Sequence, residues 1–460
     1  MDGTELDRVN GLFLRFHARF APLFGRREAR ARSEQYLRGL LVQRSERRSA
    51  ENLAEAIEGA TPRTLQMFLS DAPWSARAVV EELQRYVGER LGTAEGAFLI
   101  DETGFAKQGK KSVGVARQYS GTLGKVGNCQ VGVFLTYASA RGHATVDARL
   151  FLPEAWSEDP ERCREAGVPD EVSFRTKPEI ALELLGKARQ AEHLPGRWVA
   201  ADEVYGNSPV FRDGVAALGL WYVGDVSCDL PVFAEAAQTR VPPYAGRGRR
   251  PVKSRLAPGA APAREVQSLA AALPESAWQE LEVAEGSQGP RLYRFARLRV
   301  WESREGLPGR ACWLLLRTAV DGSEPRYALS NALAEVSLLA LAQVQTTRWS
   351  IETEFETLKG EVGLDEYEVR GWRGWHHHVT LALLAGAFLL SLQQEWGEKD
   401  APAHTPADLP RAARDPASPP MEPRGSARLA RRHPAAKRGG QAEPPQTKAA
   451  SQTTPAAHAA

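Results

Sequence analysis

Cysteine is scarce in this sequence, and none of it is placed for a metal site or a disulfide framework. The four cysteines among 460 residues are scattered and form no C-x-x-C pair. That spacing excludes the usual zinc-ribbon, iron–sulfur and disulfide-scaffold classes. The N-terminus is charged and lacks the apolar segment of a signal peptide. We therefore expect a soluble intracellular protein.

Long apolar runs are also missing. The most apolar stretch, Leu381–Leu392, is shorter than the roughly 18 residues that a membrane span requires. The sequence therefore predicts no membrane segment.

Neither sign of charge dominates. The net charge is +2, but residues 401–460 hold nine basic and four acidic residues, so residues 1–400 carry a net charge of −3. A polyanion must then be bound through local basic patches. One patch is rich in lysine, which is otherwise rare, and comprises Lys107, Lys110, Lys111, Arg117 and Lys125. Another is a Pro/Gly/Arg loop that contains Arg247, Arg249 and Arg250. A solvated hairpin is the alternative interpretation of the lysine-rich stretch.

Residues 1–95 have helical periodicity throughout. Around the breaker Ala60–Pro62 they form a short helix–turn–helix pattern, in which Pro62 occupies a favourable first helical position. Such a pair can place a helix bearing Arg63 in a DNA groove. An ordinary helical hairpin has the same pattern, so both interpretations stay open.

The rest of the chain changes character four times. Residues 96–230 alternate apolar strands with helices, which indicates an α/β domain with a buried sheet. Residues 231–330 read as a β-rich insertion, and residues 331–396 are again helical. Residues 397–460 are rich in Ala, Pro and Arg without periodicity, which predicts a disordered basic tail.

Two aspartates share one context, because Asp101 and Asp202 each end an apolar strand and are each followed by glutamate. A carboxylate at the end of a buried strand has the rigid support that a metal site needs. Carboxylate oxygens suit Mg²⁺ or Mn²⁺. The alternative is that each aspartate only caps the turn or helix that follows it.

A third carboxylate lies on a predicted helix over residues 345–359. At 100° per residue, Arg348, Glu352 and Lys359 fall within one narrow stripe, whereas Glu354 points away and Glu356 is the local rival. The flanking cations favour an ionised Glu352 and can hold phosphates beside it. An ion-paired surface helix is the alternative.

The spacing Arg-x3-Glu-x6-Lys at Arg348, Glu352 and Lys359 resembles the signature around the third catalytic acid of DDE-type transposases from bacterial insertion sequences, in the branch with the Y-x2-R-x3-E-x6-K signature. Gln345 stands where that family has the tyrosine. Further similar stretches span about residues 10–395, and they are Phe98–Gly104, Gly114–Tyr119, Ala201–Gly206 and Lys359–Asp365.

The resemblance implies an RNase H-like catalytic core, interrupted by a β-rich insertion and preceded by a helical DNA-binding region. Asp101 is then on the first core strand, Asp202 on the fourth and Glu352 on a later helix. It also implies two Mg²⁺ (or Mn²⁺) ions, cleavage of DNA at the terminal inverted repeats of an element, and strand transfer into target DNA. A homodimer on DNA and a cytoplasmic, nucleoid-associated location follow. A metal-dependent nuclease on the same fold and a domesticated, non-catalytic DNA-binding regulator are the alternatives.

Overall fold

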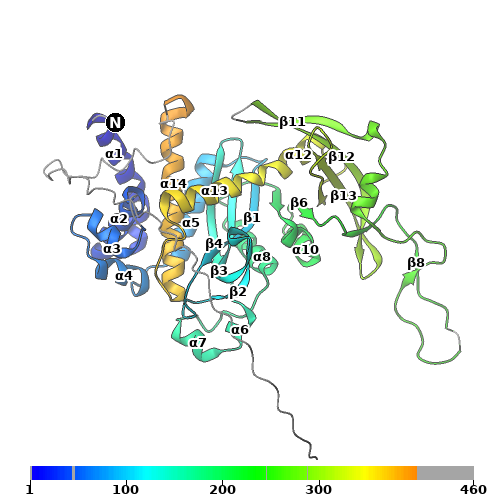
Figure 1. Ribbon diagram of the computed structural model, residues 1–460, viewed down its shortest axis with the longest axis horizontal. Coiled ribbons are helices and arrows are strands. Elements are labelled where there is room, and N and C mark those ends of the chain that lie inside the picture. Colours follow the sequence, from blue (N-terminus) through cyan, green and yellow to red (C-terminus); the bar gives the residue numbers. More distant parts are fainter. Residues whose placement is uncertain (1–2, 44–46, 245, 287–288, 401–460) are drawn as a thin grey trace, which may run out of the picture. The chain divides into compact units, whose positions relative to one another are not determined.

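A computed structural model describes residues 3–43, 47–244, 246–286 and 289–400. The predicted disordered tail lies outside the described residues from 401 onward. The described part is a mixed α/β structure in which helices pack on both faces of one large mixed sheet (Figure 1). The DNA-binding role of residues 1–95 and the domain boundaries drawn from the sequence stay predictions.

Five strands form the part of the sheet that carries the predicted aspartates. In spatial order they are β4 (Gly142–Leu150), β3 (Lys125–Ser139), β1 (Ala97–Ala106), β5 (Trp198–Ala201) and β6 (Trp221–Val226). The last three are mutually parallel, whereas β3 and β4 are antiparallel to their neighbours. The short strand β2 (Ala116–Ser120) pairs with β3. The first four residues of β1 and all of β5 are buried, as expected for strands covered on both faces.

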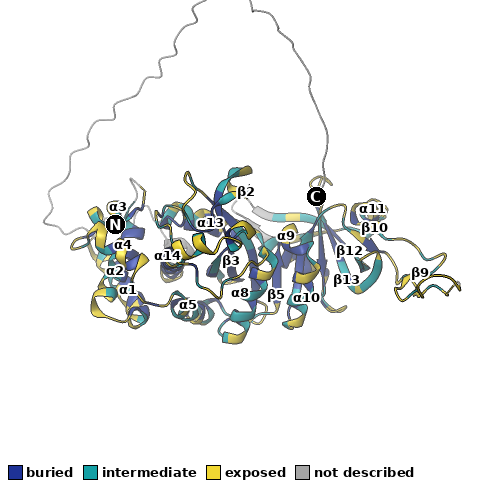
Figure 2. Ribbon diagram, turned by 90° about the horizontal axis from the view of Figure 1, so that it is seen from below, coloured by how far each residue is buried: buried dark blue, intermediate teal, exposed yellow. Residues whose placement is uncertain are grey.

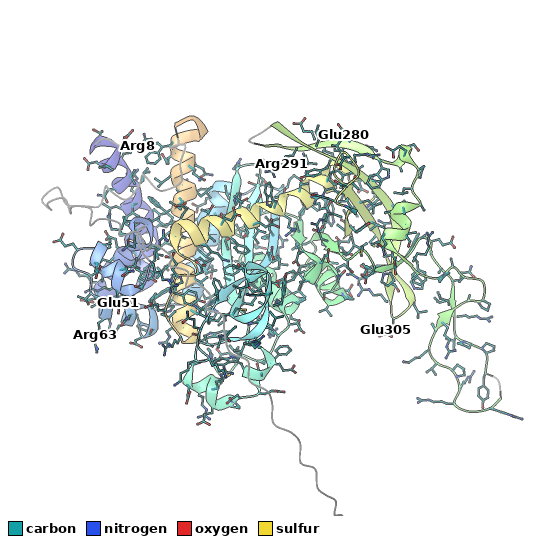
Figure 3. The ribbon with its side chains drawn as sticks, in the orientation of Figure 1. Arg8, Glu51, Arg63, Glu280, Arg291 and Glu305 are labelled. Carbon is teal, nitrogen blue, oxygen red and sulfur yellow. The ribbon has the colours of Figure 1, made fainter. Side chains whose placement is uncertain are left out.

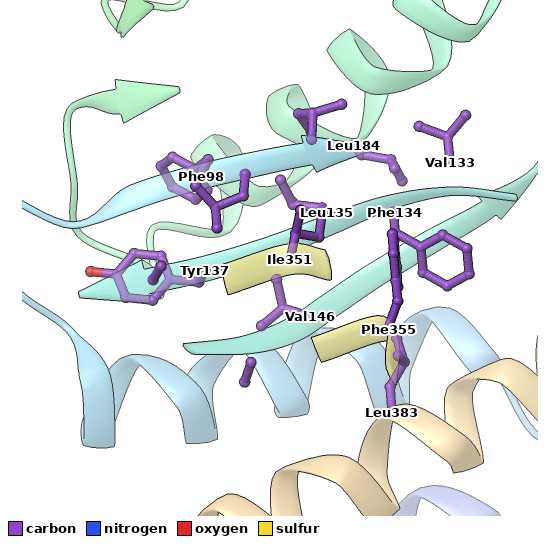
Figure 4. Close-up of a cluster of buried hydrophobic side chains, with 14 of the residues drawn as sticks. Phe98, Val133, Phe134, Leu135, Tyr137, Val146, Leu184, Ile351, Phe355 and Leu383 are labelled. Carbon is purple, nitrogen blue, oxygen red and sulfur yellow. The ribbon is translucent and has the colours of Figure 1, made fainter. Parts of the chain in front are cut away.

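Helices cover both faces of these strands. On one face lies α8 (Lys177–Ala191), which begins with a capping box between Thr176 and Glu179. On the other face lies α13 (Trp349–Val362). Figure 4 shows Leu184 of α8 on one side of the strands, with Ile351 and Phe355 of α13 on the other. Shorter helices complete the connections: α6 (Glu154–Ser157), α7 (Pro160–Glu165), α9 (Glu203–Gly206) and α10 (Pro209–Ala217).

The segment predicted as a β-rich insertion continues the same sheet. Its elements are β7 (Pro231–Phe233), β8 (Thr239–Arg240), β9 (Arg255–Leu256), β10 (Arg264–Glu265), α11 (Val266–Ala271), β11 (Gln279–Gly286), β12 (Gly289–Arg304), β13 (Leu307–Thr318) and β14 (Arg326–Ser330). Strand β14 pairs with β6, and the order β14-β13-β12-β7-β10 extends the sheet from there. A buried ion pair of 3.0 Å between Arg212 of α10 and Glu302 of β12 joins the two parts.

The N-terminal helices pack around the last helix, α14 (Trp372–Asp400). They are α1 (Gly3–Phe20), α2 (Arg27–Val42), α3 (Ala50–Ala56), α4 (Pro62–Ser70) and α5 (Ala76–Leu91). By length and composition the segment Trp372–Trp396 is apolar enough to cross a membrane, although the sequence predicted no such segment. Its most apolar window is 89% buried inside the protein, so its apolar character is that of a core helix. In Figure 2 the helices expose their outer faces, while the strands between them are mostly buried.

Three consecutive histidines on α14 are part of this packing. His377 Nδ1 lies 2.8 Å from the carbonyl oxygen of Leu69 and Nε2 lies 3.1 Å from that of Trp74, and the ring stacks on Trp74 at a centroid distance of 3.7 Å. His378 Nδ1 is 2.8 Å from the hydroxyl of Tyr36. Burial lowers the pKa of each of the three histidines to about 4. This run therefore joins helices from the two ends of the described chain.

Candidate active site

The two aspartates predicted from their strand-end context lie side by side. Strands β1 and β5 pair in parallel register, with Ile100 opposite Ala201. Asp101 is the next residue of β1, and Asp202 directly follows β5 as the N-cap of α9, so the two aspartates lie side by side. The sequence prediction that Asp101 ends its strand is wrong, because β1 continues past it and pairs with β3 as far as Ala106. Burial is the main reason why the pKa of Asp101 rises to about 7 and that of Asp202 to about 6. The negative charge of Asp202 adds to the rise at Asp101, which shows that the two carboxyl groups interact.

The alternative role, as a local cap, is present for Asp202, whereas Asp101 lies inside β1 and has no turn or helix directly after it to cap. Asp202 Oδ1 accepts a hydrogen bond of 3.0 Å from the amide of Val204 at the start of α9, and Asp101 Oδ1 accepts one of 2.7 Å from the amide of Glu102. These bonds use one oxygen of each group. Asp101 Oδ2 instead faces Arg348 Nη1 at 3.5 Å. Capping and participation in the acidic site are therefore compatible.

The neighbouring glutamate on β1 faces the opposite side of the sheet. Glu102 accepts hydrogen bonds from Lys177 Nζ at 2.5 Å and from the hydroxyl of Tyr205 at 2.8 Å. Asp101, by contrast, is opposite Phe134 in the ladder, and the ring of Phe134 packs against Phe355 of α13. Asp101 is thus the acid of this pair that faces α13.

The predicted continuous helix that carries the third acid is divided in two. Helix α12 (Leu338–Thr347) ends where α13 begins, with Arg348 between them. The hydroxyls of Thr346 and Thr347 donate to the carbonyls of Ala342 and Gln343, respectively. Such back-bonding bends helices, which accounts for the break.

Arg348 connects the predicted carboxylates. Its guanidinium lies 3.0 Å from Glu352 Oε1, 3.5 Å from Asp101 Oδ2 and 3.4 Å from Asp225 Oδ2. Glu352 is the most exposed of these acids, with 46% of its side chain accessible. Asp101 and Glu352, which are 251 positions apart in sequence, therefore lie within reach of one cation. Within the described ranges, no group of three His, Cys, Asp or Glu residues is close enough together to hold a metal ion.

Lys359 lies on the same face of α13, as the helical phasing predicts. Its ammonium donates to the hydroxyls of Thr103 at 2.7 Å and Thr122 at 3.0 Å. Thr103 is two residues beyond Asp101 on β1, so both side chains point to the same side of that strand. Burial lowers the pKa of Lys359. The arginine, glutamate and lysine of the stripe are thus arranged along the end of β1.

Asp225 is an acid that the sequence reasoning passed over. It lies on β6, beside β5, and its Oδ1 accepts a hydrogen bond of 2.8 Å from Gln345 Nε2. Gln345, which replaces the family tyrosine, therefore contacts this carboxylate. The signal was present in the sequence, because Asp225 follows the apolar run Trp221–Gly224 just as Asp101 and Asp202 follow theirs.

One glycine permits the close packing at this edge. A Cβ atom at Gly206, the last residue of α9, would lie 1.8 Å from the carbonyl oxygen of Asp225. Gly224 of β6 approaches the same backbone, and a Cβ atom there would be 3.0 Å from the Cα of Gly206. Only glycine lets α9, which Asp202 caps, pack directly on the strand that carries Asp225.

The lysine-rich patch is divided by the structure. Lys110, Lys111, Arg117 and Lys125 are exposed. Lys107 instead turns inward, with its ammonium 3.6 Å from the ring centroid of Tyr367, and burial lowers its pKa to about 8. The patch stays a predicted DNA-binding surface, and its exposed cations are the four residues other than Lys107.

The arginine-rich loop lies elsewhere. Arg247, Arg249 and Arg250 are exposed in the connection between β8 and β9. Figures 1 and 2 show this connection beyond β12 and β13, away from β1. It is therefore not beside the acidic cluster, and its role in binding DNA stays a prediction.

Comparison with known proteins gives two findings. A family model described as DDE superfamily endonuclease matches residues 19–290, which is more than half of the chain. A probable transposase for insertion sequence element IS701, from Microchaete diplosiphon, is 30% identical over 162 residues. That alignment covers 35% of this chain and 40% of the relative, so the chain spans well under two thirds of the relative's length.

Proposed function

The chain belongs to the DDE superfamily of endonucleases, and from that premise we propose that it is a transposase that cleaves DNA at the ends of an insertion sequence and joins them to target DNA. In this proposal Asp101, Asp202 and Glu352 are the catalytic acids, and they would hold two Mg²⁺ or Mn²⁺ ions once the ions displace Arg348, since the described acids do not form such a group without them. The observation that carries it is that Asp101, on β1, lies beside Asp202, which directly follows the adjacent parallel strand β5, with Glu352 on the same arginine as Asp101.

The electrostatics of the cluster fit a cation. Burial raises the pKa values of Asp101 and Asp202, and the negative charge of a neighbouring acid adds to each rise: Asp202 for Asp101, and Glu102 for Asp202. The two carboxylates therefore lack sufficient positive charge around them. Their donor atoms are carboxylate oxygens, which suit Mg²⁺ and Mn²⁺. Arg348 supplies part of the missing charge, and divalent ions would compete with it for Asp101 and Glu352.

The strand order supports the RNase H-like core in this proposal. Counting β1, β3, β4, β5 and β6 as core strands one to five, the sheet order is 3-2-1-4-5. Asp101 then lies on the first core strand, Asp202 follows the fourth, and strands β7–β14 are inserted between the fifth strand and α12. Residues 96–230 and 331–396 form the two parts of the core, and residues 231–330 form the insertion.

The protein groups around the acids position the DNA. When bound, the metal ions activate a water molecule and stabilise the leaving 3′-oxygen of a phosphodiester. Arg348, held from the far side by Asp225, and Lys359, held by Thr103 and Thr122, neutralise the phosphates beside that bond. The freed 3′-hydroxyl is the nucleophile for joining, so one site performs both steps without a covalent enzyme intermediate.

The partners follow from this chemistry. The substrate is double-stranded DNA: the terminal inverted repeats of an element and a target. The helical region 1–95, the exposed lysine-rich patch and the β8–β9 loop are the proposed binding surfaces. A homodimer on the DNA brings two element ends together, and a cytoplasmic, nucleoid-associated location fits such a substrate.

The test uses Asp101→Asn, Asp202→Asn and Glu352→Gln, with Glu356→Gln as the matched control because Glu356 is exposed on the same helix. Each protein is incubated with Mg²⁺ and a supercoiled plasmid that carries the DNA flanking its gene. We expect the three variants to lose strand cleavage while keeping affinity for DNA, and to lose Mn²⁺ binding measured by electron paramagnetic resonance. The control should retain all three.

Several outcomes would contradict the proposal. Loss of cleavage in Glu356→Gln with full activity in Glu352→Gln would show that the third acid is misassigned. Cleavage without any joined product would favour the nuclease, and DNA binding without metal-dependent cleavage would favour the non-catalytic regulator.

A further inference from the structure

A pocket of about 520 Å³ opens beside Glu352, and four arginines are among its lining residues. Strands β11–β14 form one wall, and α12 and α13 form another. Its charged lining residues include Arg291, Arg317, Arg326, Arg348, Asp225 and Glu352. We call this the arginine pocket. Figure 3 shows Arg291 where β11 and β12 pass close to α12 and α13.

Positive charge in the arginine pocket exceeds negative charge. Both carboxylates are engaged by Arg348, at 3.4 Å for Asp225 and 3.0 Å for Glu352. No ion pair is found for Arg291, Arg317 or Arg326 with any described residue. The guanidinium groups of Arg291 and Arg317 instead lie over aromatic rings, those of Trp349 and Tyr293, at 3.9 and 4.9 Å from the ring centroids.

Two of these arginines face each other at a cost. Arg317 of β13 and Arg326 of β14 are direct partners in the antiparallel ladder. Like charges placed directly opposite each other destabilise a sheet. Burial lowers the pKa of Arg317, and the charges of Arg326 and Arg348 lower it further, although Asp225 partly offsets this. An arrangement of this kind is relieved when an anion binds between the cations.

A buried polar atom also lacks a partner in the pocket. Gln345 lines the pocket and is only 4% exposed, and its Nε2 donates to Asp225. Its Oε1 has no hydrogen-bond partner among the described residues. Buried polar atoms in folded proteins are normally paired. A phosphodiester has no donor for this oxygen, so a donor such as a water molecule that hydrates a bound phosphate would satisfy it.

We propose that the arginine pocket binds backbone phosphates of the DNA strand that passes Glu352. The inference rests on the proposed function, since it takes DNA as the substrate, and it assigns a binding role to residues of the insertion strands. Arg317 and Arg326 contact the phosphates directly. The ring of Tyr293 holds Arg317 in place, and the ring of Trp349 holds Arg291 beside them. The inserted strands therefore extend the DNA path from the acidic cluster onto β13 and β14.

The test compares two double variants. One carries Arg317→Gln and Arg326→Gln together, and the control carries Arg299→Gln and Arg310→Gln together. The control removes the same charge from β12 and β13, outside the pocket lining. Affinity for a fluorescent duplex is measured by anisotropy in EDTA over a range of salt concentrations. Each phosphate contact contributes about 0.9 to the slope of log affinity against log salt. We expect the slope to fall by about 1.8 in the pocket variant, so that between about 50 and 200 mM salt it loses about 12-fold less affinity than the wild type.

The outcomes separate this inference from the proposed function. If the wild type binds the duplex and the pocket variant keeps the slope of the control, the pocket is not on the DNA path and the inference is wrong. If the wild type does not bind DNA at all, the proposed function itself fails. Arg326→Gln alone, at an exposed position, should reduce the slope by about 0.9 and guards against misfolding of the double variant.

Discussion

Replacing Glu354 with glutamine separates two carboxyl groups that lie two residues apart on α13. Glu352 faces the acidic cluster, whereas Glu354 is buried against β4. Its Oε1 accepts a hydrogen bond of 3.1 Å from the amide of Thr145, and its Oε2 lies 3.6 Å from His143 Nε2. Burial lowers the pKa of His143, which favours its neutral form, and raises that of Glu354 to about 7, so Glu354 is mainly neutral below pH 7.

The raised pKa makes the stability of the fold depend on pH. The ordinary pKa of a glutamate is 4.5, and the folded value for Glu354 is about 7. Between these values the folded protein holds a proton that the unfolded chain has released, so the free energy of unfolding falls as the pH rises. From about pH 5 to about pH 8 this group alone costs about 2.5 kcal/mol. Glutamine keeps the acceptor for Thr145 and cannot ionise, so the variant avoids this cost.

Urea unfolding of the wild type and Glu354→Gln at both pH values measures the effect. The variant should gain about 2 to 3 kcal/mol relative to the wild type on going from the lower to the higher pH. The comparison cancels the contributions of the buried histidines, which both proteins share. The variant should also retain metal-dependent cleavage, unlike Glu352→Gln. Equal pH dependence in the two proteins would refute the burial argument, and loss of cleavage would refute the phasing of α13.

Two further predictions concern residues other than the three proposed catalytic acids. Asp225→Asn should reduce the cleavage rate about 10-fold, because Arg348 loses the charge that holds it; this loss corresponds to about 1.4 kcal/mol of transition-state stabilisation. Affinity for DNA should change by less than about twofold. An unchanged rate would show that Asp225 does not position Arg348. Neutralising Arg247, Arg249 and Arg250 together should flatten the salt dependence of duplex binding by up to about 2.7 in slope; an unchanged slope would place the β8–β9 loop off the DNA path.

The part of the site that depends on local patterns could be predicted from the sequence. An apolar run followed by aspartate located both Asp101 and Asp202, but it marked a strand end only at Asp202, because β1 continues past Asp101 to Ala106. Helical spacing placed Arg348 and Glu352 within contact distance of each other, since they are four residues apart. The same reasoning overlooked Asp225, although its context is equivalent. It also treated residues 333–359 as one helix, because the back-bonding of Thr346 and Thr347 is not visible in periodicity.

Features that depend on distant pairings could not be predicted. Nothing in β14 indicates that it pairs with β6, so the insertion was not expected to continue the central sheet. The direct opposition of Arg317 and Arg326 depends on the register of β13 and β14, which follows from the turn and the sheet rather than from either residue. His377 and His378 of α14 contact groups more than 300 positions away, and a single sequence carries no record of those partners.

The packing of α14 against the N-terminal helices has a consequence for the order in which the protein folds during synthesis. Phe13 and Phe16 of α1 pack against Phe388 of α14, so the part of their surface that Phe388 covers has no partner until most of the chain has left the ribosome. Chains are made from the N-terminus at about 5–20 residues per second, which leaves this surface uncovered for roughly 20 seconds or more. Glu352 emerges in the same late interval. The proposed cleavage site and its supporting helices are therefore completed together, and a ribosome that stalls before α13 releases no protein able to cut DNA.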